Sequence, residues 1–530
     1  MIMIKPPTTA LTFLNRLSTS TQFHPSPMRR PRKFSIAITT VLGIALAYLY
    51  ININRGTMPV SQHPQPLPRH SPKCIVVGAG LAGLSAASQL LTHNIPVLLL
   101  ERAAKPGGNS IKASSGINGA PTRYQSGADD AFFSDTVKSA GKAIYTWTTH
   151  REKLIGALTD QSAGAIDWLV DEKFVDLSQV AILGGHSVAR THRGKGGTPP
   201  GYAIISALLN SLEKSPLFRI RTECTVTEIL KEKSSVSGVR FKCKDGTEDE
   251  RANGPVVFAA GGFGGDTHGL LTKHRPDLSG FPATVETRPG AQPLLTEVGA
   301  QLIDMDLIQV HPTGFVDPAQ PTLFSKFLAA EVLRGEGGIL MRNGERFVNE
   351  LDMRENVTSA ITALPSNESS LKQWDVQLVL DESVYQACKS HVDFYIFKGL
   401  MKKTHLSELG PAALTTLQNY VKIFSGGQKD EFGRSEFSNW GLSDPTPESV
   451  VYVGTVTPVV HFTMGGVVVD ENAQVLDKQM NPIEGLWAAG EITGGVHGTN
   501  RLGGSSLLEC VVFGRIAGNM CATYIGKEER

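Results

Sequence analysis

The sequence predicts an α/β protein built on a doubly wound parallel sheet. The first observation is an apolar strand at Cys74–Val77 that leads directly into a glycine-rich turn. The second is a second apolar run, Val97–Leu100, which is followed by Glu101. The residues between the glycine-rich turn and this run are enough for one helix. The third is that two later apolar runs, residues 255–262 and 486–491, also break into glycine. Strands that end in glycine at one edge are typical of open α/β sheets that bind ligands there.

The composition is that of a globular protein with two or three domains. The chain has 530 residues, of which 41% are hydrophobic and 19% are charged. Its 51 Lys and Arg residues balance 50 Asp and Glu residues, so no excess of charge favours a nucleic-acid partner. The six cysteines show no C-x-x-C spacing and no Cys/His metal spacing. We therefore expect no disulfide framework, no iron–sulfur cluster and no bound metal.

The N-terminal region differs from the rest of the chain in charge. The first acidic residue of the whole chain is Glu101, so the region before it contains cations and no acids. Residues 1–33 carry six cations among Ser and Thr, which predicts a basic targeting segment. Residues 34–53 are uncharged, and roughly 20 residues at about 1.5 Å each match a membrane core of about 30 Å. We predict a transmembrane helix there, followed by a Pro-rich linker at 54–72. The alternatives are a cleaved presequence or signal, or a start at Met58.

More cations precede the apolar segment than follow it, which favours an N-terminus on the cytosolic or matrix side. The large domain would then lie in the opposite compartment, held to the membrane by this segment. We expect a membrane-anchored mitochondrial protein, with the endoplasmic reticulum as the alternative.

The turn after the first strand predicts a dinucleotide site. Gly78 permits a tight turn, Gly80 lets a pyrophosphate approach the backbone, and Gly83 lets the helix pack closely on the strand. The helix N-terminus directs its amides at the anion, and Glu101 is placed to bind ribose hydroxyls. A glycine motif alone is a weak signal, but here strand, helix, second strand and acid occur in order.

A second glycine- and hydroxyl-rich stretch, residues 105–119, favours FAD over NAD. It is suited to run along an extended dinucleotide toward a flavin. The late strands that end near Gly261 and Gly490 are expected to bring further backbone to the same ligand.

Six ordered motifs carry a resemblance to a known family: GGNS at 107–110, QVHPTG at 309–314, EVLRG at 331–335, ERFVNE at 345–350, HFTMGG at 461–466 and GVHGTNRLGG at 495–504. From about residue 73 to 523, the chain resembles FAD-dependent fumarate reductase and succinate dehydrogenase flavoproteins, and among them the soluble fungal-type fumarate reductases. The resemblance implies an FAD-binding domain at 73–305 and 463–530. It also implies that a mobile α+β clamp domain at 306–462 interrupts that domain and closes over the flavin.

The resemblance implies reduction of fumarate to succinate, with hydride from flavin N5. Arg354 is then the proton donor, and Glu331 and Arg334 form its relay, because an arginine with a pKa above about 12 in water is a poor acid. A dicarboxylate needs a donor-rich grip at each end. His311 suits one end, whereas His461 and the forked guanidinium of Arg501 suit the other.

The resemblance also implies one noncovalent FAD per chain. Succinate dehydrogenases attach FAD covalently through a histidine where this chain has Asn109. The absence of this covalent bond to the flavin favours fumarate reduction over succinate oxidation. The implied cofactor residues are Gly78, Ala79, Gly80, Leu81, Ala82, Gly83, Glu101, Arg102, Asn109, Ser110, Ser115, Gly116, Ile117, Asn118, Val226, Ala260, Gly261, Gly490, Glu491, Arg501, Ser506 and Leu507.

One departure from the family lies at residues 288–297. The family usually has a Thr-Gly-Asp-Gly-like turn near the flavin, whereas this chain reads RPGAQPLLTE and lacks the aspartate. Two alternative functions remain: the same fold acting on another substrate, as in L-aspartate oxidase, urocanate reductase or ketosteroid dehydrogenase, and a binding module without flavin chemistry. The chain has no ligands for a fused haem, so the expected electron donor is free reduced flavin (FADH2 or FMNH2) or a separate reductase.

Overall fold

A computed structural model describes residues 73–196, 198–246, 248–367 and 371–528. The predicted targeting segment, transmembrane helix and Pro-rich linker lie outside these residues, so they stay predictions. Within the described ranges, no helix is long and apolar enough to cross a membrane. In the same ranges, no group of three or more His, Cys, Asp or Glu side chains is arranged to hold a metal ion.

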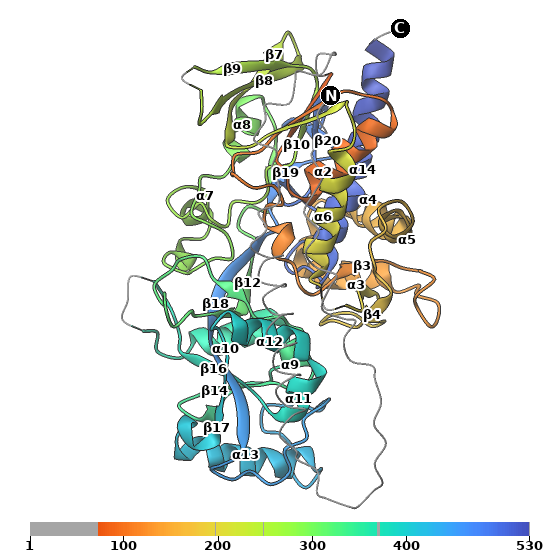
Figure 1. Ribbon diagram of the computed structural model, residues 1–530. Coiled ribbons are helices and arrows are strands. Elements are labelled where there is room, and N and C mark those ends of the chain that lie inside the picture. Colours follow the sequence, from red (N-terminus) through yellow and green to blue (C-terminus); the bar gives the residue numbers. More distant parts are fainter. Residues whose placement is uncertain (1–72, 197, 247, 368–370, 529–530) are drawn as a thin grey trace, which may run out of the picture. The chain divides into compact units, whose positions relative to one another are not determined.

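Six strands form the central sheet, in the order β20, β21, β10, β1, β2, β6 (Figure 1). Neighbouring strands are parallel except β20 and β21. Strands β1 and β2 are buried along their whole length, which is why they are continuous apolar runs. The predicted α/β class is confirmed. The bounds are β1 Cys74–Val77, β2 Val97–Leu100, β6 Phe218–Arg221, β10 Val256–Phe258, β20 Gln474–Leu476 and β21 Pro482–Ala488.

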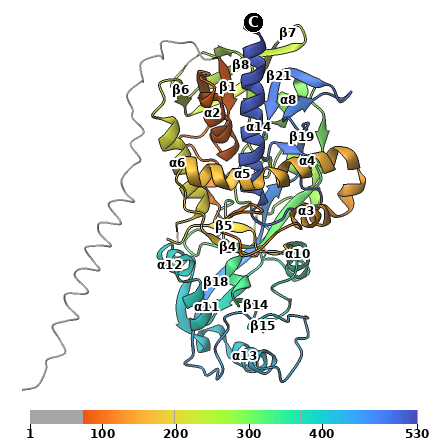
Figure 2. The ribbon, with the colours of Figure 1, turned by 90° about the vertical axis from the view of Figure 1, so that its right-hand side faces the viewer.

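Two helices from opposite ends of the sequence, α2 (Leu81–Thr92) and α14 (Ser505–Glu528), pack side by side on this sheet (Figure 2). The two helices approach so closely that a residue with a Cβ would not fit at two positions of α14. A Cβ at Gly514 would lie 2.5 Å from the carbonyl oxygen of Ala82, and one at Gly518 would lie 2.6 Å from that of Ala86. The packing brings the N-termini of both helices to one cavity, described below.

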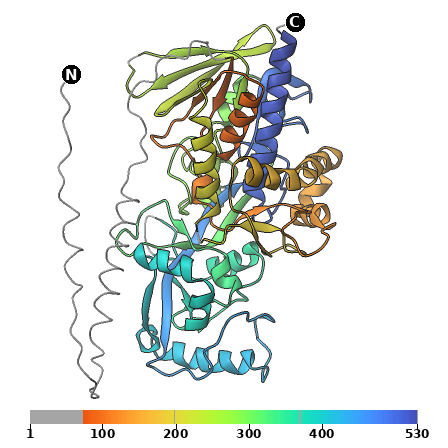
Figure 3. The same cartoon turned by 45° about the vertical axis from the view of Figure 1, so that its right-hand side comes forward.

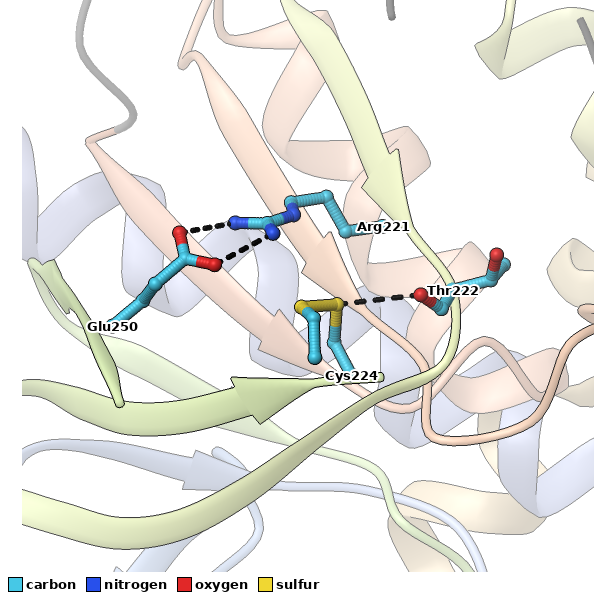
Figure 4. Close-up of a disulfide and its surroundings, with 5 residues drawn as sticks. Arg221, Thr222, Cys224 and Glu250 are labelled. Carbon is cyan, nitrogen blue, oxygen red and sulfur yellow. Dashed lines mark hydrogen bonds and ion pairs between the residues drawn. A yellow bond between two sulfur atoms is a disulfide. The ribbon is translucent and has the colours of Figure 1, made fainter. Parts of the chain in front are cut away.

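A three-stranded antiparallel sheet, β7 (Cys224–Glu232), β8 (Ser235–Cys243) and β9 (Glu250–Asn253), contains a disulfide. Cys224 and Cys243 are register partners and are bonded through sulfur (Figure 4). Arg221 and Glu250 form a two-pronged ion pair beside it, with N···O distances of 2.5 and 2.7 Å. The sequence analysis expected no disulfide framework and did not predict this single bridge.

A second large sheet is antiparallel and has seven strands, in the order β13, β12, β18, β16, β14, β15, with β17 also paired to β18 (Figure 3). It has its own hydrophobic core, formed by residues between Phe263 and Val460. The domain boundaries at 305/306 and 462/463, and the mobility of the clamp, stay predictions. The strands are β12 Ile308–Phe315, β13 Phe327–Leu328, β14 Ile339–Arg342, β15 Glu345–Arg346, β16 Val376–Leu380, β17 Lys402–His405 and β18 Val450–Thr463. The helices beside them are α9 Val332–Gly335, α10 Arg354–Thr362, α11 Glu382–Ala387, α12 Lys389–Phe397 and α13 Pro411–Phe424.

Smaller elements complete the described part of the chain. Two more three-stranded sheets have the orders β3, β5, β4 and β11, β19, β22. The remaining bounds are α3 Phe132–Ala140, α4 Thr148–Asp160, α5 Ser162–Asp167, α6 Pro200–Leu212, α7 Leu270–His274, α8 Gln292–Glu297, β3 Ile117–Asn118, β4 Gln179–Ala181, β5 Thr191–Arg193, β11 Leu302–Ile303, β19 Gly466–Val468 and β22 Thr493–Gly494.

Candidate active site

The turn between β1 and α2 has the geometry of a phosphate-binding turn. Gly78 has a φ of +103°, and a Cβ there would lie 2.4 Å from the carbonyl oxygen of Ala259. A Cβ at Gly83 would lie 1.9 Å from the carbonyl oxygen of Gly78, whereas the space at Gly80 is open. No side chain caps α2, and its first turn contains no acid. The N–H of Leu81 donates a long hydrogen bond to the hydroxyl of Ser110, at 3.4 Å. The N-terminal turn of α2 as a whole still favours an anion, because its amides point along the helix axis toward the cavity.

A cavity opens at the carboxyl ends of β1, β2 and β10, whose last residues Val77, Leu100 and Phe258 line it. The Glu101 carboxylate also faces the cavity and accepts hydrogen bonds from the N–H groups of Ala79 and Ala103, at 2.7 and 2.8 Å. Of the expected cofactor residues, those that line the cavity are Gly78, Gly80, Leu81, Ala82, Glu101, Arg102, Asn109, Ser110, Val226, Ala260, Gly261, Gly490, Glu491, Ser506 and Leu507.

The other expected cofactor residues do not line this cavity: Ala79, Gly83, Ser115, Gly116, Ile117, Asn118 and Arg501. Asn118 is buried, and its amide donates to the carbonyl oxygen of Gly503 and the hydroxyl of Ser505, at 2.8 and 2.9 Å. It thus supports the turn that begins α14, rather than facing the cavity. Sequence reasoning missed several lining residues, among them Lys112, Thr284, Arg288, Lys326 and Phe462.

Two histidines meet next to this cavity because their strands are paired. His311 lies on β12 and His461 on β18, and the ring centroids are 5.6 Å apart at an interplanar angle of 73°. His311 is buried, and His461 is partly buried. Burial, followed by repulsion from nearby arginines, lowers both pKa values well below the usual 6.5. Both side chains are therefore neutral at pH 7 and act as hydrogen-bonding groups.

Three residues expected to move a proton are in contact. Glu331 precedes α9 and forms ion pairs with Arg354, at the start of α10, and with Arg334, at 3.7 Å. Burial raises the pKa of Glu331, but attraction from Arg354 and Arg334 outweighs it and leaves the pKa at about 2. The carboxylate is therefore ionised and is shared between two guanidinium groups.

Gln309 connects the two arginines on which the expected chemistry depends. Its Oε1 accepts a hydrogen bond from Arg354 at 2.8 Å and another from Arg501 at 3.0 Å. Arg501 also lies 4.6 Å from the ring centroid of Phe462. Sequence reasoning quoted Gln309 in a motif but gave it no role. Its place two residues before His311 on a strand was the signal that could have found it.

The cluster is richer in positive than in negative charge. Arg354, Arg334 and Arg501 carry three positive charges, and Glu331 is the one acid paired or hydrogen-bonded with them among these contacts. Glu491 and Glu509 also attract Arg501, but each does so less strongly than Arg354 repels it. Burial and repulsion from Arg354 lower the pKa of Arg501 to about 9, so it is still protonated at pH 7. His461 Nδ1 and Arg501 Nε are buried and have no hydrogen-bond partner among the described residues. Such groups are stable when a bound anion completes their bonding.

The comparisons with known proteins agree with this geometry. The FAD binding domain family matches residues 73–507. This chain belongs to the FAD-dependent fumarate reductase and succinate dehydrogenase flavoprotein family. It is 45% identical over 472 residues to fumarate reductase 1 of Saccharomyces cerevisiae, which covers 84% of this chain and 98% of that protein. It is 39% identical to a fumarate reductase of Schizosaccharomyces pombe over 84% of this chain and 88% of that one.

A solved structure gives the same family. The open conformation of a flavocytochrome c3 fumarate reductase superposes with a TM-score of 0.71 at 30% identity, over 86% of this chain and 79% of that chain. The predicted family, fold class and cofactor are confirmed: the protein is an FAD-dependent oxidoreductase. The residues described above fit FAD, because the glycine turn, the uncapped N-terminus of α2 and the acid at the end of β2 all face one cavity.

Proposed function

We propose that this protein reduces fumarate to succinate. The observation that carries the proposal is the excess of positive charge at Arg354, Arg334 and Arg501, with the neutral rings of His311 and His461 close by, which suits a dicarboxylate. The relatives named fumarate reductase support it. A monoacid would leave one of these buried charges unpaired, which is costly in a water-excluded site.

The protein groups bind and orient the substrate. Arg501 presents a forked guanidinium to one carboxylate, and His461 offers a buried ring nitrogen to the same end. His311 serves the other end as a neutral ring. FAD, when bound and reduced, supplies a hydride to one carbon of the alkene.

Arg354 is the proposed acid, and it gives a guanidinium proton to the neighbouring carbon. Gln309 and Glu331 hold this guanidinium by two different nitrogens, so its direction is set before substrate binds. The charge of Arg354 is the first of the attractions that lower the pKa of Glu331. Loss of the Arg354 proton therefore raises the proton affinity of Glu331. The carboxylate can then take a proton from Arg334 and pass it on.

The test is reoxidation of the reduced, FAD-loaded protein in an anaerobic stopped-flow experiment. We expect fumarate to reoxidise the flavin, because it can bind both grips. Crotonate, which has the same carbon skeleton but one carboxylate, is the matched control and should react slowly or not at all. Rapid reoxidation by urocanate or crotonate without reaction with fumarate would overturn the proposed substrate. Turnover with reduced FMN as the only electron source tests the proposed free-flavin donor.

We also propose that FAD is held without a covalent bond. Asn109 lines the cavity where family members with a linked flavin carry a histidine, and a carboxamide is not a nucleophile for this reaction. Acid precipitation should release all of the flavin into the supernatant, where its absorbance is measured. Yellow colour that stays with the precipitated polypeptide would contradict this expectation.

A further inference from the structure

Three cations converge on one side of the cofactor cavity: Arg102 after β2, Lys112 beside Ser110, and Arg288 in the loop before α8. Arg102 donates to the carbonyl oxygen of Pro289 at 3.0 Å, and Lys112 donates to that of Thr284 at 3.1 Å. These bonds fix the cations against one loop. Among the described residues, no carboxylate lies within 4.0 Å of any of the three.

The three cations repel one another. Burial lowers the pKa of Arg102 to about 10, with repulsion from Arg288 as the next cause. Burial is the main cause that lowers the pKa of Lys112. Attraction to Glu286 opposes this effect, and a smaller repulsion from Arg288 adds to it. Arg288 Nε is buried without a hydrogen-bond partner among the described residues. A cluster of this kind is stable when an anion lies between its members.

The position of Arg288 indicates which anion it meets. Its Nη2 is 3.9 Å from the point where a Cβ at Gly261 would lie. Gly261 follows Ala260, whose Cα is 3.2 Å from the corresponding point at Gly78, in the turn that leads to α2. The guanidinium therefore lies beside the turn at Gly261, which in turn contacts the glycine turn that leads into α2.

The loop that contains Arg288 is held in place by hydrogen bonds and close packing next to Gly290. The N–H groups of Gly290, in this loop, and of Leu270, the first residue of α7, both donate to Asp266 Oδ2, at 3.1 and 2.9 Å. A Cβ at Gly290 would lie 2.7 Å from Leu270 Cδ1 and 2.9 Å from Phe263 Cβ. No side chain fits at Gly290, so the backbone next to Arg288 is tightly packed.

We propose that Arg288, with Arg102 and Lys112, binds the pyrophosphate of FAD together with the N-terminus of α2. Arg288 begins the segment in which this chain lacks the aspartate of the family turn. The proposal concerns the cofactor, and so it stands independently of the substrate that is reduced.

The experiment compares flavin binding by full-length protein freed of FAD, for wild type, Arg288→Ala and Arg288→Lys. Arg251→Ala is the matched control, because Arg251 is exposed on β9 and pairs with Glu232 away from the cavity. Dissociation constants for FAD and for riboflavin, which has no phosphate, are measured by quenching of flavin fluorescence at several salt concentrations. Arg288→Ala should weaken FAD binding by about 10- to 100-fold, the usual effect of losing a charge-assisted hydrogen bond.

Three further results are expected. Riboflavin should bind Arg288→Ala as it binds wild type, Arg288→Lys should restore part of the FAD affinity, and FAD binding by Arg288→Ala should depend less on salt. An unchanged FAD dissociation constant would overturn the proposal. An equal loss for FAD and riboflavin would also overturn it, because it would show that Arg288 only supports the fold of the loop.

Discussion

Replacing Arg354 with alanine is expected to lower the rate of fumarate reduction by about 1,000- to 10,000-fold, the upper range for loss of a general acid. The guanidinium is held by Gln309 and Glu331, and no other described cation contacts both of these residues. Arg354 does not line the cofactor cavity, so the FAD content should stay normal. Arg354→Lys should also be nearly inactive, because an ammonium cannot reach both partners with the same geometry.

Stopped-flow reoxidation by fumarate measures this loss in one turnover, separately from electron supply. Glu355→Gln is the control, since Glu355 is the next residue on α10 and is exposed. If Arg354→Ala protein were reoxidised at the wild-type rate, the proton would have to come from another group. An Arg354→Ala protein that lost its FAD would point to a structural role instead.

Replacing Arg501 with alanine is expected to raise KM strongly and also to lower kcat, at a total cost of about 2–4 kcal/mol in kcat/KM. Arg501 acts in both the ground state and the transition state, because it binds a carboxylate that does not react. Part of the fall in kcat has a second cause. Arg501 shares Gln309 with Arg354, so its loss frees one of the two groups that orient the acid.

The KM and kcat of Arg501→Ala are measured by steady-state reduction of fumarate with reduced FMN. Thermal unfolding is the control. Burial lowers the pKa of Arg501 to about 9, so at pH 7 its folded charge is disfavoured relative to the unfolded chain. Removing the charge should not by itself destabilise the fold. A normal KM in a normally folded variant would show that Arg501 does not hold the substrate.

The dinucleotide-binding turn could be predicted from local sequence, because its chemistry depends on residues that are close together in the chain. The strand Cys74–Val77, its glycine turn and the acid at the end of β2 lie within 28 residues, and their order alone indicates a dinucleotide. A glycine at a turn can be interpreted from the sequence alone, because glycine adopts the positive φ of such a turn at little cost in any tertiary context. The family motifs supported the FAD assignment and the fold in the same way.

Contacts between residues far apart in sequence were not predictable in this way. Gln309 looks like an ordinary strand residue until β12 and α10 bring it against Arg354 and Arg501. Cys224 and Cys243 become partners only when β7 and β8 pair in one register.

The sequence by itself determined the family, the cofactor and the α/β class, because these depend on motifs that are complete within short segments. Only the tertiary structure decided which charges stand unpaired. Arg288 lies 186 positions after Arg102 in the sequence, and the loop before α8 places it beside the cavity. The physical reason is that charge interactions depend on distance and burial in the folded state, and neither can be read from order along the chain.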